Sequence, residues 1–511
     1  MKKTLFGLIY MSSYKIQLNI VDLKDLTVIE QLDSPSFLQA DSKSQVFEQD
    51  MDKICDAIEG FKEKLAEYQI KDFKFYGNEQ LIDEMSASFI ADQIKVRTGW
   101  KIEWLNGGQI VYAKVLSGMK SQAEVNDDGK DHATYLLSLG SAMINLSLFK
   151  NNKFESSWSL ALGPREIQEI NEITNETPND PIYVINDYLG AKIGHLARQI
   201  KDNSRAAVII QHADALNNTY LKKENSANQI THEEFQHFYD QLIQMSLNDI
   251  MQNYDLEPAV ADHAIPNAIS IKQFLSLLNI GTIYITDMSV VTGLLMLEKR
   301  GKDTDIMMTS AQNMARRYLV DLHHANAVRK FALHIFDRLR KVHLLPKSAR
   351  ELLGWAATVD DIGSFVNQAR RYEQSADFIE ANELIGMSDR ENEIVSEICR
   401  YQTIDDGDGS APNIGGHHYR HLDPDVQLTV AKLSAILRIA TALDASHKQK
   451  IKQIVISLKK NNELVIRAKT NADITLERWS FNKRVKLFED VFGIKVVLKQ
   501  EGMNRQWVVH F

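Results

Sequence analysis

The sequence has only two cysteines in 511 residues, Cys55 and Cys399. Two cysteines exclude a disulfide scaffold and a cysteine-based zinc site, and such sparse usage is typical of a reducing compartment. No stretch approaches about 18 uninterrupted apolar residues, so we expect no membrane-spanning helix. The apolar run after Met1 lacks a small-residue cleavage site, and we interpret it as a first strand. We therefore predict a cytoplasmic protein.

A strong charge of one sign is also absent. The formal net charge is −9, with 25% charged and 44% hydrophobic residues. This is ordinary globular composition, and its acidic balance argues against broad non-specific binding to DNA. It leaves room for local basic patches that take phosphate ligands. A length of 511 residues predicts three or four domains.

Two stretches predict strand pairs that are joined by tight turns of small residues. The first pair turns at Ser12 and Ser13, and the second turns at Gly140 and Ser141. Small residues in such turns let backbone N–H groups approach a phosphate, because no bulky Cβ intervenes. The alternative is a plain hairpin that binds no ligand.

The periodicity of the chain divides it into four parts. Strands followed by alternating helices and strands occur twice, over residues 1–128 and 129–300, which predicts a duplicated α/β domain. Residues 305–449 have almost purely helical periodicity and predict an all-α domain. Residues 450–511 return to strands around one helix, which predicts a small α/β tail domain.

Several segments, taken in order, resemble the exopolyphosphatase/guanosine-pentaphosphate phosphatase (Ppx/GppA) family. Residues 98–107 look like its TG-x-x-I-E-x-I-S-G segment, and residues 159–163 look like its S-L-P-L-G segment. Residues 356–363 and 437–444 are similar to its HD-type region, and residues 488–493 are similar to its tail. The likeness covers nearly the full length. It implies the fold class α/β: duplicated actin-like (ribonuclease H-like) domains with a phosphate cleft between them, followed by an all-α HD-like domain and a small α/β tail domain.

In this family a water molecule attacks the terminal phosphorus of a polyphosphate or nucleotide chain, and carboxylates hold a divalent metal and activate the water. The resemblance places neutral residues at those charged positions here. Tyr10 stands for an aspartate and Gln17 for an arginine of the first hairpin. Gln109 stands for a catalytic glutamate, and Ser138 and Asn145 stand for the acids of the second hairpin. We therefore predict no catalytic residue and no cofactor, with Mg²⁺ expected only if the protein is active.

The HD-like domain shows a similar loss. Its metal site would need histidines and aspartates, which are the usual ligands. His324 and Asp361 match, but Asp360 replaces a histidine and Thr441 stands where an aspartate is usual. Two ligands do not make a metal site, so we predict none here.

The other candidate site residues also have ordinary structural interpretations. Glu103 and Asp131 lie near the motifs and are candidates for relocated acids, or they are ordinary surface carboxylates. His417, His418 and His421 lie in a glycine-rich stretch and are either transition-metal ligands or part of a solvated loop.

Three functions remain open from the sequence. The first is a diverged family member that binds polyphosphate or guanosine phosphates with weak or no hydrolysis, through Ser12, Ser13, Gly140 and Ser141. The second is an active exopolyphosphatase that releases terminal phosphate with relocated carboxylates. The third is a non-catalytic dimeric scaffold. We expect a homodimer and no nucleic-acid or membrane partner.

Overall fold

The chain forms two compact units, Met1–Asp303 and Thr304–Phe511. The division into four domains stays a prediction. None of the described helices is long and apolar enough to cross a membrane. The computed structural model describes residues 4–12, 15–36, 48–79, 82, 84–124, 133–140, 143–163, 167, 170, 181–197, 199–200, 205–221, 228–402, 414, 416–459 and 462–502.

The first unit begins with a five-stranded sheet in the order β3-β2-β1-β4-β5. The first three strands form an antiparallel meander, as their alternating pattern predicts, and the last two run parallel to β1. The strands are β1 (Leu5–Met11), β2 (Lys15–Asp22), β3 (Thr27–Pro35), β4 (Phe73–Asn78) and β5 (Glu103–Leu105).

The second sheet of this unit has the order β10-β11-β9-β6-β7-β8. Strands β6, β7 and β8, the first three along the chain, again form an antiparallel meander. Strands β9 and β11 run parallel to β6. The strands are β6 (Ala133–Leu139), β7 (Ile144–Lys150), β8 (Lys153–Leu160), β9 (Ala206–Gln211), β10 (Gln229–Ile230) and β11 (Ile280–Thr286). Apart from the added edge strand β10, the two sheets share one topology. The predicted duplication is therefore confirmed.

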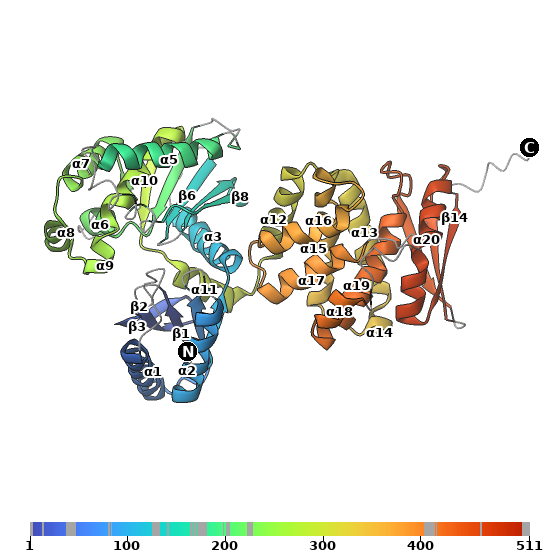
Figure 1. Ribbon diagram of the computed structural model, residues 1–511, viewed down its shortest axis with the longest axis horizontal. Coiled ribbons are helices and arrows are strands. Elements are labelled where there is room, and N and C mark those ends of the chain that lie inside the picture. Colours follow the sequence, from blue (N-terminus) through green and yellow to red (C-terminus); the bar gives the residue numbers. More distant parts are fainter. Residues whose placement is uncertain are drawn as a thin grey trace, which may run out of the picture. The chain divides into compact units, whose positions relative to one another are not determined.

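Helices cover these sheets (Figure 1). Strand β6 is buried along its whole length because helices lie on both faces of its sheet, as is typical of central strands in α/β domains. Helices α5 and α10 pack with the second sheet in one core cluster, whereas α3 and α11 pack with β1 in another. The helices are α1 (Glu48–Glu67), α2 (Glu84–Thr98), α3 (Gly107–Glu124), α5 (Pro181–Ala197), α6 (Asp214–Tyr220), α7 (His232–Leu242), α8 (Leu247–Tyr254), α9 (Pro258–Ala261), α10 (Ala264–Leu277) and α11 (Val290–Arg300).

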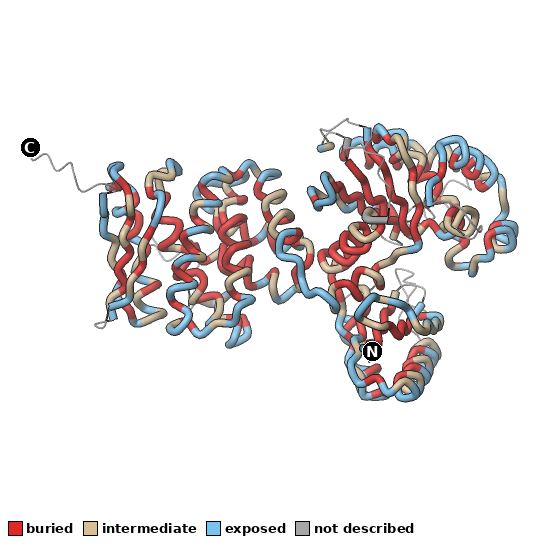
Figure 2. Tube along the Cα trace, turned by 180° about the vertical axis from the view of Figure 1, so that it is seen from behind, coloured by how far each residue is buried: buried red, intermediate tan, exposed pale blue. Residues whose placement is uncertain are grey.

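The second unit is a helical bundle that continues into a small sheet of order β12-β13-β14, and in both units the buried residues gather on the strands and the inner helix faces (Figure 2). This agrees with the change in periodicity along the sequence. The elements are α12 (Thr304–Arg317), α13 (Leu322–Arg338), α14 (Arg340–His343), α15 (Ser348–Val359), η2 (Ile362–Phe365), α16 (Arg371–Ala381), α17 (Asp389–Arg400), α18 (His417–His421), α19 (Pro424–Ala442), β12 (Gln453–Leu458), β13 (Glu463–Lys469), α20 (Thr475–Phe492) and β14 (Lys495–Glu501).

Two local expectations differ from the structure. The periodicity of residues 231–255 suggests one helix, but the chain forms α7 and α8, because Ser246 and Asp249 make a second capping box that restarts the helix. The histidines expected in a loop at 417–421 form the short helix α18.

Candidate functional site

The two predicted phosphate hairpins are present, but their described turn residues are used within the turns. The Ser12 N–H donates to the Lys15 carbonyl oxygen at 2.9 Å, and the Ser12 hydroxyl donates to the same oxygen at 3.1 Å. The Gly140 N–H donates at 3.0 Å to a carbonyl oxygen further along its own turn. These amides therefore close the hairpins. The other two predicted residues, Ser13 and Ser141, lie outside the described residues.

Tyr10 ends up as a core residue at the end of β1. It belongs to a hydrophobic cluster with Phe6 and Leu8 of the same strand. Burial raises the pKa of the phenol, and a hydrogen bond with Asn78 opposes this only in part. The position that the family uses for an acid therefore holds a neutral side chain.

Gln109 acts as a cap of α3. Its side-chain oxygen accepts from the Asn106 N–H at 3.2 Å, and its own N–H donates to the Asn106 side-chain oxygen at 2.9 Å. These reciprocal bonds satisfy two backbone donors at the helix N-terminus. The side chain at this position thus stabilises a helix, and an amide accepts no proton from water.

Ser138 and Asn145 face each other across the β6–β7 ladder. The Ser138 hydroxyl donates to the Gln211 side-chain oxygen at 2.9 Å. The Asn145 amide donates to the Ser159 hydroxyl at 2.8 Å, and its oxygen accepts from the Lys114 ammonium at 2.6 Å. Both residues that replace acids therefore have protein partners for their polar atoms.

One face of α3 is joined by hydrogen bonds to the carboxyl ends of β9 and β11. The Gln211 amide donates to the Ser117 hydroxyl at 2.7 Å and to the Met288 carbonyl oxygen at 2.6 Å. The hydroxyls of Ser121 and Thr286 lie 3.3 Å apart. Neutral polar groups thus fill the edge of the sheet at which α/β proteins of this kind bind ligands.

Lys114 is the one cation of this α3 face, and the motif comparison missed it. Its side chain is buried, with the residue 5% exposed, and burial lowers the pKa of its ammonium to about 8. A Cβ added to Gly140 would lie 3.3 Å from the Lys114 Nζ, so the ammonium lies directly over the second hairpin. A lone lysine in the apolar run 110–116 is the signal that could have identified it.

Lys15 is a second lysine whose charge influences the titratable groups near the second hairpin. His212 follows β9 with a φ of 63° and has its Nδ1 3.3 Å from the Ser138 hydroxyl. Burial, and then the positive charges of Lys114 and Lys15, lower its pKa to about 3. Burial raises the pKa of Asp214, and the charge of Lys15 opposes this. The charges of both Lys114 and Lys15 therefore reach the region of the hairpins.

Glu103, one of the two candidates for a relocated acid, does not enter this constellation. Glu103 is exposed on β5, where it pairs in register with Tyr76. Asp131 lies outside the described residues.

In the HD-like region, the carboxylate that meets His324 is Asp444. Their Nδ1 and Oδ2 atoms lie 2.9 Å apart, and the His324 ring stacks on His447 with centroids 3.6 Å apart. Thr441 instead donates to a backbone carbonyl of its own helix at 2.9 Å. Matching the motif position by position pointed to Thr441, and the acid one helical turn later was missed.

Asp360 and Asp361, in the same region, have different surroundings. Burial, together with the adjacent charge of Asp361, raises the pKa of Asp360 to about 7. Asp361 forms an ion pair with Arg371 at 3.1 Å. Within the described ranges, no three histidine, cysteine or acidic side chains come together as a metal site would require. That this domain holds no metal stays a prediction.

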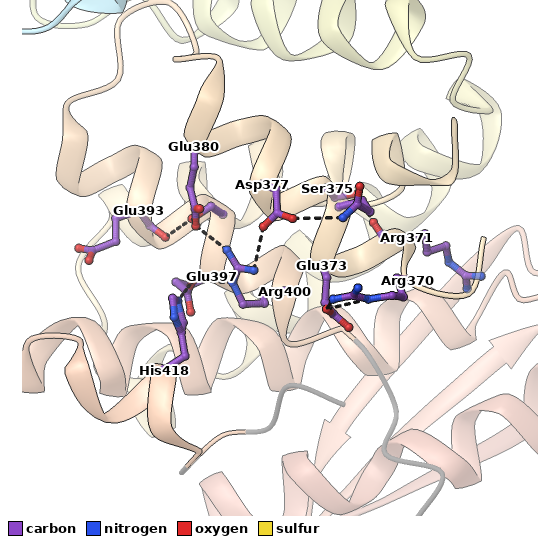
Figure 3. A network of polar contacts seen from close by, with 12 residues as sticks. Arg370, Arg371, Glu373, Ser375, Asp377, Glu380, Glu393, Glu397, Arg400 and His418 are labelled. Carbon is purple, nitrogen blue, oxygen red and sulfur yellow. Dashed lines mark hydrogen bonds and ion pairs between the residues drawn. The ribbon is translucent and has the colours of Figure 1, made fainter. Parts of the chain in front are cut away.

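His418 belongs to a network of ionic contacts around Arg400 (Figure 3). Its Nε2 lies 2.8 Å from a carboxylate oxygen of Glu397, which is only 1% exposed. Arg400 binds the same carboxylate at 2.9 Å and reaches Asp377 at 3.1 Å and Glu380 at 2.6 Å on α16. His418 itself is 60% exposed, so it lies at the solvated edge of this ionic network.

The repeated strand order, with a meander followed by parallel strands in each sheet, defines a duplicated α/β protein of the actin-like ATPase fold, here followed by a helical unit. Residues 306–485 match the family model "Ppx/GppA phosphatase, domain III". The helical region is therefore a Ppx/GppA domain III, which confirms the family predicted from the sequence motifs. No curated protein matches the chain.

Several solved structures are similar to parts of the chain. A Ppx/GppA family member from Aquifex aeolicus is 14% identical and covers 58% of this chain and 98% of its own, with a TM-score of 0.47. An exopolyphosphatase from Cytophaga hutchinsonii is 17% identical and covers 59% and 99%, with a TM-score of 0.49. The ethanolamine utilization protein EutJ from Carboxydothermus hydrogenoformans is 9% identical and covers 42% and 80%, with a TM-score of 0.26.

Proposed function

We propose that the protein binds the phosphate chain of polyphosphate or of a guanosine phosphate and hydrolyses it weakly or not at all. The proposal of weak or absent hydrolysis rests on the surroundings of the residues that replace the family's acids. Tyr10 is buried in a core cluster, and Gln109, Ser138 and Asn145 have protein partners. A general base alone contributes about 10²–10⁴ in rate, and the metal-holding acids are replaced as well.

The positive charges of Lys114 and Lys15 near the hairpins support the proposed phosphate binding. Lys114 lies over the turn at Gly140, and both Lys114 and Lys15 depress the pKa of His212. The acids that would otherwise repel an anion are neutral residues here. A phosphate chain therefore finds cations without a need for metal neutralisation.

A scaffold with a vestigial cleft is the second candidate, and one observation favours it. The Ser12 and Gly140 amides are used within their own turns, and α3 is bonded to the strand ends through Ser117 and Gln211. To bind a ligand, such a site would have to break these internal hydrogen bonds and replace them with bonds to the ligand.

Two measurements on the full chain separate these functions. We expect calorimetry with long-chain polyphosphate and with guanosine tetraphosphate, without metal, to show binding that weakens steeply with salt. We expect phosphate release from polyphosphate with Mg²⁺ to be close to background. Turnover within about tenfold of an ordinary exopolyphosphatase would support the active enzyme instead, whereas no heat at millimolar ligand would leave the scaffold.

Gly140→Val is a poor probe of this binding. A Cβ at Gly140 would lie 2.7 Å from the Met143 carbonyl oxygen, so the side chain would distort the hairpin before it met any ligand. Loss of binding in that variant would therefore not show that phosphate contacts the turn at Gly140.

The proposal includes a cytoplasmic location and a homodimer. Both cysteines are free and buried, in line with a reducing compartment. Light scattering on the purified chain would measure the oligomeric state.

A further inference from the structure

Lys114 is a buried cation without a matching anion in the described part of the chain. Its ammonium has three N–H donors, and the acceptor found for it is the neutral Asn145 side-chain oxygen at 2.6 Å. No described carboxylate forms an ion pair with it, and burial alone shifts the pKa of its ammonium. Burying an ammonium without a counter-charge is costly, and proteins avoid it unless the charge has a use.

The groups around Lys114 do not supply the missing negative charge. His212 is kept neutral by burial and by the lysine itself. Lys15 adds a further positive charge and bonds Asp33 at 2.8 Å on the neighbouring strand. Asp214 is exposed at the start of α6, and its carboxylate senses the charge of Lys15 and forms no ion pair with Lys114. Gly140 has no side chain, and a Cβ built there would lie 3.3 Å from the Lys114 Nζ, so the ammonium lies next to the backbone of the second hairpin.

We propose that Lys114 is the cation that binds a phosphate group at the second hairpin in place of a metal ion, and that residue 145 is neutral because a carboxylate there would occupy Lys114. This rests on the proposed phosphate binding. A neutral amide oxygen is a weaker partner for an ammonium than a phosphate oxygen, so an arriving anion displaces Asn145. An aspartate at 145 would form a permanent buried ion pair and compete with the ligand.

The proposal makes the loss of the family's acid at position 145 a requirement for binding in this chain. It also means that binding does not require Mg²⁺. Added Mg²⁺ takes phosphate oxygens that Lys114 would otherwise contact, so it weakens the complex. A site of the family's ordinary kind would respond to Mg²⁺ in the opposite direction.

The test uses tripolyphosphate as the probe, the full chain and metal-free buffer, with calorimetry as the readout. Asn145→Asp is nearly isosteric, and we expect it to weaken binding about 10- to 100-fold while raising the thermal midpoint through the new ion pair. We expect Lys114→Met to weaken binding by a similar factor. Lys120→Met on the same helix is the matched control, and we expect wild-type binding from it.

Each outcome has a separate meaning. If wild type binds and Asn145→Asp binds as tightly, the role of Lys114 is overturned while phosphate binding stands. If wild type shows no binding at millimolar tripolyphosphate, the proposed function fails as well. A folded Lys114→Met variant with wild-type affinity, or binding that strengthens with Mg²⁺, would also overturn the inference.

Discussion

At the scale of single residues, the replaced catalytic positions have acquired structural contacts. Gln109 caps a helix, and Asn145 holds the Lys114 ammonium. Tyr10 fills a core cluster. Because each new side chain is tied into the fold, restoring one acid does not rebuild the family's cleft. Activity depends on several charges acting together on one phosphate.

We expect Gln109→Glu to leave phosphate release within about twofold of wild type, because general-base catalysis needs the other acids and their metal. A glutamate still accepts the Asn106 N–H bond, so the helix cap survives. Phosphate release from polyphosphate with Mg²⁺ measures the effect, and circular dichroism confirms folding. A rise of about a hundredfold would show that the other replacements do not matter.

The buried charge of Lys114 predicts how stability depends on pH. Its pKa falls from 10.5 to about 8 in the folded protein, which corresponds to a cost of about 3 kcal/mol while the ammonium is charged. Between these values the unfolded chain binds more protons, so this contribution to stability rises with pH from about 8 to 10.5. Below about 8 the full cost is present.

Lys114→Met removes this cost. We expect the variant to exceed wild type in free energy of unfolding by about 2–3 kcal/mol at pH 7, with the difference shrinking towards pH 10. Urea denaturation at the two pH values measures it, with Lys120→Met as the control. A difference that grows with pH would contradict the buried charge.

At the scale of elements, the contact between α3 and α11 depends on a glycine. A Cβ at Gly293 would lie 1.8 Å from the Ala113 carbonyl oxygen, so the two helix backbones are in direct contact. Backbone cannot move aside as a flexible side chain can. Gly293 is therefore required by packing, whatever the cleft binds.

We expect Gly293→Ala to lower the free energy of unfolding by about 1–3 kcal/mol, as overpacking does. Gly194→Ala is the matched control, since Gly194 is an exposed helical glycine with open space around its Cβ position. We expect the control to gain about 0.5–1 kcal/mol from helix propensity. Thermal unfolding followed at 222 nm compares the two, and equal midpoints would refute the close packing.

At the scale of the whole molecule, one topology is used twice within the first unit, and an independent helical unit follows. The second unit has its own core, in which α13, α15, α17 and α19 pack together and α20 packs on α19. A unit that buries its own apolar surface can fold alone.

We expect residues 304–511, expressed as a fragment, to unfold in urea as a single cooperative transition. Far-UV and near-UV circular dichroism, recorded through the same titration, provide two probes whose curves should coincide. A fragment that binds hydrophobic dye and shows no near-UV signal would mean that its core needs the first unit.

Much of the fold could be predicted because periodicity is a local property. The strand pairs β1–β2 and β6–β7 and the helical stretch from α12 to α19 agree with the sequence pattern. The break between α7 and α8 was missed, because the competing capping box at Ser246 lies inside one continuous apolar pattern. The candidate site could be predicted only as a set of replaced positions.

By itself, the sequence determined the order of the elements, their duplication and the loss of charged residues from the motifs. The tertiary structure decided which groups meet. Lys114 reaches Asn145 across 31 positions, and His324 reaches Asp444 across 120. Burial also decided that Lys114 carries an unmatched charge, since a side chain's solvent exposure depends on packing between segments far apart in the chain. Long-range contact and desolvation leave no local pattern, which is why the cation over the second hairpin appeared only in the folded protein.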